Sequence, residues 1–247
     1  TLEMPVAAEH DRYVHLNRIL LTSSHAPMLF SERAIPALLC LLLLSLLTAL
    51  PARSQQAARD TARVEAPELR RELLTMSSAD QEMRAELVEL IKTSDGQPDM
   101  QVFMRMKARV DSLDATHADR VGEIIEEHGW PRPALVGKDG VEAAFLIVQH
   151  ADPAFQEEAL PLVRNAYQRG ELSGQSLALL TDRVRVGDGR PQLYGTQANM
   201  QNGEITFHPI ADSVQVDRRR AELGMAPLSE YIEQLKAAYM QQQGDGN

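Results

Sequence analysis

The sequence comprises 247 residues, of which 44% are hydrophobic, 24% charged and 4% aromatic, and it contains one cysteine. These proportions are typical of an ordinary globular domain and exclude a disordered, a collagen-like and a multi-span membrane protein. The 25 basic and 35 acidic side chains give a formal net charge of -10, which argues against a broadly basic surface for nucleic acid. We therefore expect one globular domain that does not bind nucleic acid.

An uncharged apolar run, Ala34 to Leu50, dominates the first part of the chain. Arg33 precedes it and Ala52-Arg53-Ser54 follows it, a small-x-small sequence of the kind at which signal peptides are cleaved. The run is shorter than the roughly 20 residues that span a bilayer. We predict a signal peptide at 28–54, starting at Met28, and export to the periplasm or the medium. The alternative is an uncleaved signal that anchors the chain in the inner membrane, because the run slightly exceeds a typical signal core.

The chain begins with Thr1 rather than Met, so residues 1–27 are set aside as an upstream extension and excluded from site reasoning. Cys40 lies inside the apolar run and follows Leu39, whereas a bacterial lipid-attachment box has a small residue there. Cleavage after Ser54 would remove the only cysteine, which excludes disulfides, thiol nucleophiles and cysteine-bound zinc. No stable membrane span is then expected.

Helical periodicity governs most of the chain that follows a linker at 55–66. Apolar residues recur at spacings of three, four and seven between Glu68 and Lys92, which is typical of an amphipathic helix, or of a helix pair broken near Ser77. Further helices are expected at Met100 to Leu113, Ala115 to His128, Val141 to His150, Asp152 to Arg169 and Ser173 to about Val186. The segment Val141 to His150 is apolar around most of its circumference, so it is predicted to be the buried central helix.

The pattern changes after Gly187-Asp188-Gly189. Gln192 to Gln197 and Glu204 to Pro209 are short mixed stretches, and the Asn202-Gly203 pair between them is a strong signal for a hairpin turn. Helical runs at Val214 to Leu223 and Leu228 to about Gln241 close the chain. The sequence thus predicts a mainly α fold, a single helical domain at 67–243 with one small β-hairpin near the C-terminal third.

Several motifs follow one another along the chain: His128-Gly129-Trp130-Pro131, Val148-Gln149-His150-Ala151-Asp152, Leu180-Thr181-Asp182-Arg183 and Gln192-Leu193-Tyr194-Gly195-Thr196-Gln197. In order and spacing they resemble a bacterial family known only as a domain of unknown function. The resemblance covers roughly Glu68 to Tyr231 and implies no established activity. The signal-bearing N-terminus looks like an addition to the domain of that family.

His150 is the first candidate for chemistry, because it ends the apolar helix on the face of Ala143, Leu146 and Ile147. As a general base or metal ligand it would use Asp152, two residues on, as an orienting carboxylate or second ligand. The alternative is a core histidine at a helix C-terminus, where the helix dipole favours the charged form.

Asp182 and Arg183 flank the apolar stripe of a later helix. Asp182 is a candidate second carboxylate that converges on His150, as an acid/base partner or a metal ligand. The alternative is an ion pair between this helix and the hairpin. Asp80-Gln81 in the first helix is a further candidate for the same polar centre.

The candidate ligand-binding residues are Gln149, Trp130, Tyr194, Gln197 and Arg183. Trp130 precedes a proline, and such a pair lines a pocket or anchors a loop. Tyr194 or Gln197 would donate to a bound substrate oxygen, or the polar groups around them would cap helix ends and satisfy buried backbone.

The sequence supports alternative functions for these clusters. The first is a non-catalytic envelope module that binds a small molecule, a peptide or an envelope partner. The other is a hydrolase-type enzyme, metal-assisted in one form, with His150 as base, Asp152 or Asp182 as orienting carboxylate, and Tyr194 or Gln197 stabilising developing charge. No Walker loop, dinucleotide fingerprint, zincin motif or nucleophile elbow occurs. The sequence therefore selects no cofactor and no metal.

Overall fold

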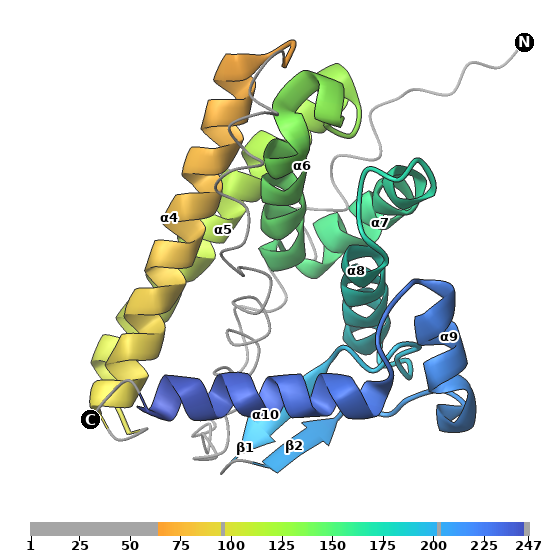
Figure 1. Ribbon diagram of the computed structural model, residues 1–247. Coiled ribbons are helices and arrows are strands. Elements are labelled where there is room, and N and C mark those ends of the chain that lie inside the picture. Colours follow the sequence, from red (N-terminus) through yellow and green to blue (C-terminus); the bar gives the residue numbers. More distant parts are fainter. Residues whose placement is uncertain (1–63, 95–96, 202–203, 245–247) are drawn as a thin grey trace, which may run out of the picture. The chain divides into compact units, whose positions relative to one another are not determined.

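The computed structural model describes residues 64–94, 97–201 and 204–244 of the chain. The predicted signal peptide at 28–54, the upstream extension at 1–27 and nearly all of the linker at 55–66 lie outside the described residues. Figure 1 shows the elements, which are α4 (Pro67–Thr93), α5 (Met100–His128), α6 (Pro133–His150), α7 (Pro153–Gln168), α8 (Gly174–Gly187), β1 (Ala198–Gln201), β2 (Glu204–Phe207), the 3-10 helix η1 (Ser213–Gln215), α9 (Val216–Glu222) and α10 (Leu228–Gly244). The predicted fold class, mainly α with one small hairpin, is confirmed.

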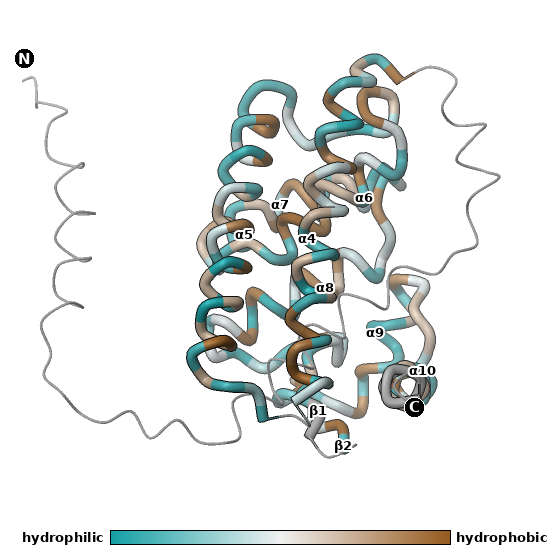
Figure 2. Tube along the Cα trace, turned by 90° about the vertical axis from the view of Figure 1, so that its left-hand side faces the viewer, coloured by the Kyte–Doolittle hydropathy of each residue, from teal (hydrophilic) through white to brown (hydrophobic). Residues whose placement is uncertain are grey.

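The long helices α4 and α5 lie side by side and cover one side of α6 (Figure 1). Along both, hydrophilic and hydrophobic residues alternate (Figure 2), as expected for helices with one buried face. α4 is a single helix through Ser77, the first of the two alternatives predicted, and α5 continues through Asp114, where a boundary between two helices was expected. That boundary was wrong because neither glycine nor proline interrupts the backbone there. α5 ends at His128, and the glycine that follows, Gly129, has a positive φ of 71°, which a residue without a side chain adopts without strain.

α6 is the central helix, as its sequence predicted. It packs against α4, α5, α7 and α8, and Val141, Ala144 and Val148 are completely buried. The helical segment begins at Pro133 rather than Val141, with a kink at Gly137, where φ is 77°. Leu73, Val121, Val163 and Leu180, contributed by the surrounding helices, are also fully buried in the same core. His150, at the end of α6, is therefore carried by a helix that is packed against four others.

A second apolar cluster joins the C-terminal part of α4 to the N-terminal part of α5. It consists of Leu87, Val88, Ile91, Phe103 and Val110. Asp99 caps α5 beside this cluster by accepting hydrogen bonds from the backbone N–H groups of Gln101 and Val102. The two clusters are separated along α4 by buried charged residues, Asp80 and Arg84.

The hairpin pairs β1 with β2 in antiparallel register, with Ala198 opposite Phe207 and Gln201 opposite Glu204. The first strand begins at Ala198, whereas the sequence analysis placed it at Gln192 to Gln197. That segment is a loop with a single bridge, Gln192 to Ile210. The Gln192 N–H donates to the backbone oxygen of Pro209. The N–H groups of the next residues mostly donate to side chains, those of Leu193, Tyr194 and Thr196 to Asp182 and that of Gln197 to Gln192, so no strand ladder forms there. None of the described helices combines the length and the apolar character needed to cross a bilayer.

Candidate functional site

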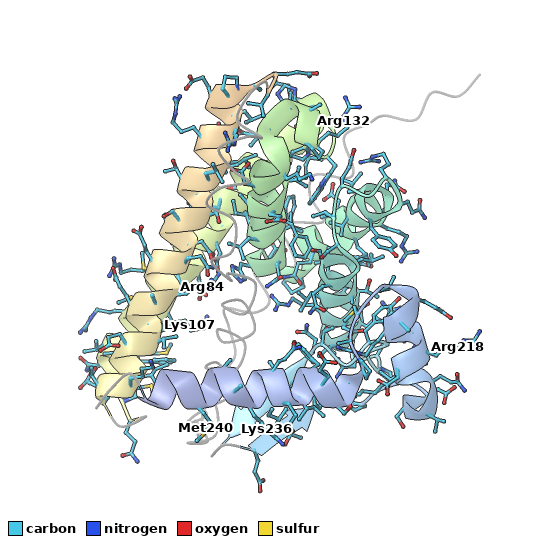
Figure 3. The ribbon with its side chains drawn as sticks, in the orientation of Figure 1. Arg84, Lys107, Arg132, Arg218, Lys236 and Met240 are labelled. Atoms are coloured by element: carbon cyan, nitrogen blue, oxygen red, sulfur yellow. The ribbon has the colours of Figure 1, made fainter. Side chains whose placement is uncertain are left out.

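A cavity of about 680 Å³ is lined by residues of α4, α5, α6, α7 and α8. Its lining includes Arg84 from α4, Asp114 from α5, His150 from α6, Gln156 from α7 and Arg183 from α8. Figure 3 shows Arg84 and Lys107, which lines the same cavity, along the α4 and α5 pair. A volume of this size is in the range of small-molecule sites. The cavity is therefore the place at which the predicted site residues are tested.

His150 contacts a carboxylate of α4. Its Nδ1 lies 2.8 Å from Oδ1 and 3.0 Å from Oδ2 of Asp80. The side chains of His150 and Asp80 are 6% and 2% exposed. The crossing of α4 and α6 thus creates a buried histidine and carboxylate pair at the wall of the cavity.

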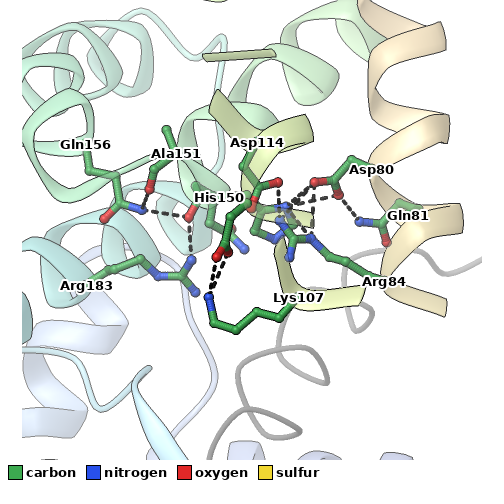
Figure 4. A network of polar contacts seen from close by, with 11 residues as sticks. Asp80, Gln81, Arg84, Lys107, Asp114, His150, Ala151, Gln156 and Arg183 are labelled. Atoms are coloured by element: carbon green, nitrogen blue, oxygen red, sulfur yellow. Dashed lines mark hydrogen bonds and ion pairs between the residues drawn. The ribbon is translucent and has the colours of Figure 1, made fainter. Parts of the chain in front are cut away.

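Arg84 joins this pair to α5, one turn after Asp80 (Figure 4). Its Nε lies 3.1 Å from Asp80 Oδ1 and 3.0 Å from His150 Nδ1. Its Nη2 donates a 2.6 Å hydrogen bond to Asp114 Oδ1. A buried guanidinium therefore lies between opposite charges from two helices.

Burial and neighbouring charge set the ionisation of this group. Burial raises the pKa of Asp80, but the hydrogen bond with His150 and the charges of His150 and Arg84 outweigh it, and the pKa is about 2. Burial, assisted by Arg84 and Arg183, lowers the pKa of His150 to about 4, against the effect of Asp80. Burial raises the pKa of Asp114 to about 6 despite Arg84. At neutral pH, Asp80 is ionised and His150 is neutral.

Arg183 and Gln149 also line the cavity. Nη1 of Arg183 donates to the backbone oxygen of Gln149, which also accepts a 2.9 Å bond from Gln156 Nε2. The Nε and Nη2 atoms of Arg183 are buried and have no hydrogen-bond partner among the described residues. The side-chain nitrogen and oxygen of Gln149, a residue that is 1% exposed, are also buried without a hydrogen-bond partner among the described residues. Burial lowers the pKa of Arg183 to about 10, which leaves it charged at neutral pH.

The carboxylates that the sequence analysis assigned to His150 lie elsewhere. Asp152 is exposed and caps α7, accepting from the N–H groups of Ala154 and Phe155. The backbone turns at Ala151, which is extended, so Asp152 faces the start of α7 and not His150. The pairing of His150 with Asp152 is therefore corrected to Asp80.

Asp182 is completely buried, and it fastens the loop that precedes the hairpin. It accepts hydrogen bonds from the backbone N–H groups of Leu193, Tyr194 and Thr196 and from the Thr196 hydroxyl. Burial raises its pKa, although these donors lower it. Asp182 thus links α8 to the loop through backbone groups and makes no contact with His150.

The candidate ligand-binding residues divide into two groups. Gln149, Gln197 and Arg183 line the cavity. Trp130 is 5% exposed within the main core, and the backbone of Tyr194 lies between Asp182 and Arg220. Gln197 donates to Thr196 Oγ1 at 3.1 Å, so its amide is less available to a ligand than that of Gln149.

Neither Arg84 nor Asp114 was predicted as a site residue, although the sequence of α4 contains a signal for Arg84. The buried side of α4 runs through Leu73 and Met76, then Asp80 and Arg84, and returns to Leu87. Charged residues that occupy the apolar spacing of an amphipathic helix are buried by the same geometry that buries their apolar neighbours. Such residues are candidates for a polar site.

Metal coordination finds no support within the described ranges, where no group of three or more His, Cys, Asp or Glu side chains is suitably placed. The fold and site define a helical domain with a central cavity that is lined by both charged and apolar side chains. The chain belongs to DUF6624, a family of unknown function, whose model matches residues 67–243. This confirms the resemblance to a domain of unknown function. Comparisons with curated proteins and with solved structures give no significant match.

Proposed function

We propose that the central cavity binds a small organic anion, with the Arg183 guanidinium as its principal contact. The observation that carries this proposal is the condition of Arg183, a buried cation with no carboxylate partner among the described residues and with Nε and Nη2 unbonded. Removing a charge from water costs several kcal/mol unless a counter-charge and hydrogen bonds compensate. A ligand carboxylate, sulfonate or phosphate would supply both.

Arg183 alone supplies the positive charge that an anion would meet. Over the whole lining, positive charges do not exceed negative ones, but the charged side chains other than Arg183 either have an ion-pair partner or, like Glu157, are exposed. Lys107 pairs with Asp111 at 2.6 Å and Arg84 pairs with Asp114. Asp188, near the end of α8, pairs with Arg190. The unbalanced positive charge is that of Arg183, so the anionic group of a ligand would lie against α8.

The remainder of the lining indicates an organic ligand rather than a bare inorganic anion. Its apolar members are Leu87, Val110, Ala151, Pro153, Ala154, Val184 and Val186. Gln149 adds an amide whose donor and acceptor are both unbonded, and this combination suits a polar group next to the anion. Each methylene that a ligand buries on such surface contributes about 0.8 kcal/mol.

This proposal keeps the binding-module interpretation of the sequence and places the binding site at the central cavity rather than at Trp130. Export of the chain, predicted from residues 28–54, is a separate proposal. If export holds, the ligand is a small anion of the periplasm or the medium. Cell fractionation of the C-terminally tagged protein tests that point independently of the cavity.

Isothermal titration of the purified protein with a matched set of probes tests the binding proposal. Hexanoate should bind more tightly than acetate, because it buries more methylenes, and more tightly than hexanol, which lacks the charge. Arg183→Met should abolish hexanoate binding. Arg185→Met, two residues along α8, should leave it unchanged, because Arg185 bonds to the backbone oxygen of Pro191. Equal binding of hexanoate and hexanol, or unaltered hexanoate binding by Arg183→Met, would overturn the proposal.

A further inference from the structure

The Nδ1 atom of His150 has competing neighbours, and they cannot both bond to it in one tautomer. Asp80 Oδ1, at 2.8 Å, can only accept a hydrogen bond, whereas Arg84 Nε, at 3.0 Å, can only donate one. If Nδ1 carries the proton, it donates to Asp80 and Nε2 is a lone pair. If Nε2 carries the proton, Nδ1 accepts a hydrogen bond from Arg84, and the Nε2–H group faces the cavity as a donor.

Electrostatics favours the proton on Nδ1. In the other tautomer the Nδ1 lone pair would face an ionised carboxylate whose oxygens lie 2.8 and 3.0 Å away, an arrangement of two acceptors that is repulsive. Arg84 does not need His150, because its Nε also lies 3.1 Å from Asp80 Oδ1 and its Nη2 bonds to Asp114. The tautomer with the proton on Nδ1 therefore satisfies Asp80, Arg84 and His150 together. It leaves Nε2 unprotonated.

His150 lines the cavity, and no described residue hydrogen-bonds to its Nε2. A carboxylate that fixes the tautomer of a neutral imidazole, with the other nitrogen left to a ligand, is the arrangement of a general base. We infer that His150, positioned by Asp80, is the general base of a hydrolytic site that cleaves ester bonds in the anion bound by Arg183. The inference rests on the proposed function for the anion alone.

The reaction can be written with this chain's own groups. His150 Nε2 takes a proton from water while the water oxygen forms a bond to the ester carbon, and the carbonyl π pair moves to oxygen. Gln149 Nε2–H is an unbonded donor for that oxyanion. When the intermediate collapses, the bond to the leaving oxygen breaks and that oxygen takes the proton from His150. The ester and water become an acid and an alcohol, and His150 returns to its starting state.

The charges around His150 support a role that depends on the ligand. Arg84 and Arg183 both lower the pKa of the imidazole. A ligand anion beside Arg183 offsets part of their charge, which raises the pKa of His150 toward the range in which an imidazole is an effective base. The base is thus strengthened when the anion is in place.

The tautomer itself is the first test, and it needs no variant and no ligand. Nitrogen-15 NMR of the histidine-labelled protein at neutral pH distinguishes protonated from unprotonated ring nitrogens, with His150 assigned by through-bond correlation. We expect a proton on Nδ1 and none on Nε2. A proton on Nε2 would overturn the inference, because the cavity would then face a donor.

Hydrolysis is the second test, with mono(4-nitrophenyl) glutarate as the probe, since it combines a carboxylate with an ester. We expect the protein to hydrolyse it and His150→Gln to lower kcat roughly 100-fold or more. The matched control is His128→Gln, at an exposed position at the end of α5, which should leave kcat unchanged. Asp80→Asn should lower kcat with little change in KM and should raise the population of the Nε2-protonated tautomer.

Hexanoate binding separates the failure of this inference from that of the proposed function. If the protein binds hexanoate and either fails to hydrolyse the probe or hydrolyses it equally well as His150→Gln, the base role is overturned and anion binding stands. If hydrolysis depends on His150 but hexanoate does not bind, the anion proposal fails instead. Thermal unfolding of each variant identifies any loss of activity that comes from loss of folding, and in that case the NMR result decides.

Discussion

Asp80 and Arg84 lie one turn apart on α4 and both reach the same atom, Nδ1 of His150, at 2.8 and 3.0 Å. They occupy the buried side of α4, between Met76 and Leu87. Apolar side chains at these positions would extend the core, and burying charges instead is costly unless they pair. Arg84 lines the cavity, and Asp80 contacts His150, which also lines it. We therefore attribute the two charged residues to the site rather than to the packing of the core.

Replacing Arg183 with methionine should make the protein more stable. The lost hydrogen bond leaves the Gln149 oxygen still bonded to Gln156, and the buried charge disappears. Exchange of buried charge for apolar volume is neutral or stabilising by about 1 to 4 kcal/mol. Urea unfolding without ligand measures the change, with Arg185→Met as the control on the same helix. A loss of several kcal/mol would show that Arg183 serves the fold and would weaken its assignment to a ligand.

Replacing Asp182 with asparagine should destabilise the protein by about 2 to 4 kcal/mol. In the wild type, the backbone N–H groups of Leu193, Tyr194 and Thr196 donate to the carboxylate oxygens of Asp182. An asparagine amide would replace one of these acceptor oxygens with an NH₂ group, which is itself a donor. Urea unfolding measures the loss. The titration of His150 should not change, since Asp182 does not contact it. A folded variant of unaltered stability with a shifted His150 titration would restore Asp182 to the catalytic role predicted from the sequence.

Asp114 and His150 should change the free energy of unfolding with pH in opposite directions. The pKa of Asp114 in the folded protein, about 6, is raised, so the stability it contributes is lost as pH rises from about 4 to 6. The pKa of His150, about 4, is lowered, so the unfolded chain binds the extra proton and stability rises over about pH 4 to 6.5. The wild type should therefore show a shallow pH dependence in this range.

Replacing either residue should reveal how the other changes the free energy of unfolding with pH. Stability of His150→Gln should fall as pH rises from about 4 to 6, and stability of Asp114→Asn should increase, each by at most about 1.4 kcal/mol per pH unit. Urea unfolding at closely spaced pH values gives both slopes. Slopes of the reverse sign would mean that the ionisation of the cavity differs from that described above.

Anion binding should strengthen at low pH. Protonation of Asp114 below about pH 6 removes a negative charge beside Arg84, while Asp80 stays ionised because its pKa is about 2. Hexanesulfonate keeps its charge over this range and should bind more tightly at pH 5 than at pH 8. In Asp114→Asn the affinity should be high and nearly independent of pH. An unchanged pH dependence in that variant would assign the effect to another group.

Much of the fold follows from local patterns. Helical periodicity identified the helices, and Asn202-Gly203 indicated the hairpin, because these signals lie within a few residues of the structure they specify. The start of β1 was misplaced because the preceding N–H groups bond to Asp182, which belongs to another helix. A contact of that kind leaves no periodic trace.

The site was predicted only in part, because some of its residues are marked by local patterns and others meet only through contacts between distant helices. His150 and Gln149 stand out as polar residues at the end of an apolar helix, and both line the cavity. The carboxylate beside His150 is 70 positions away in the sequence, whereas nearness along the chain favoured Asp152. Asp80 was a candidate for the polar centre, but only the crossing of α4 and α6 brings it to the imidazole.

The Nε–H resonance of Arg183 provides the most direct test of the central claim, that this guanidinium binds an anionic ligand. Titration of the nitrogen-15-labelled protein with hexanoate should shift this resonance in a saturable way, with a dissociation constant below about 1 mM, and hexanol should not reproduce the shift. A resonance that stays in place while hexanoate perturbs other residues, or that responds equally to hexanol, would contradict the claim.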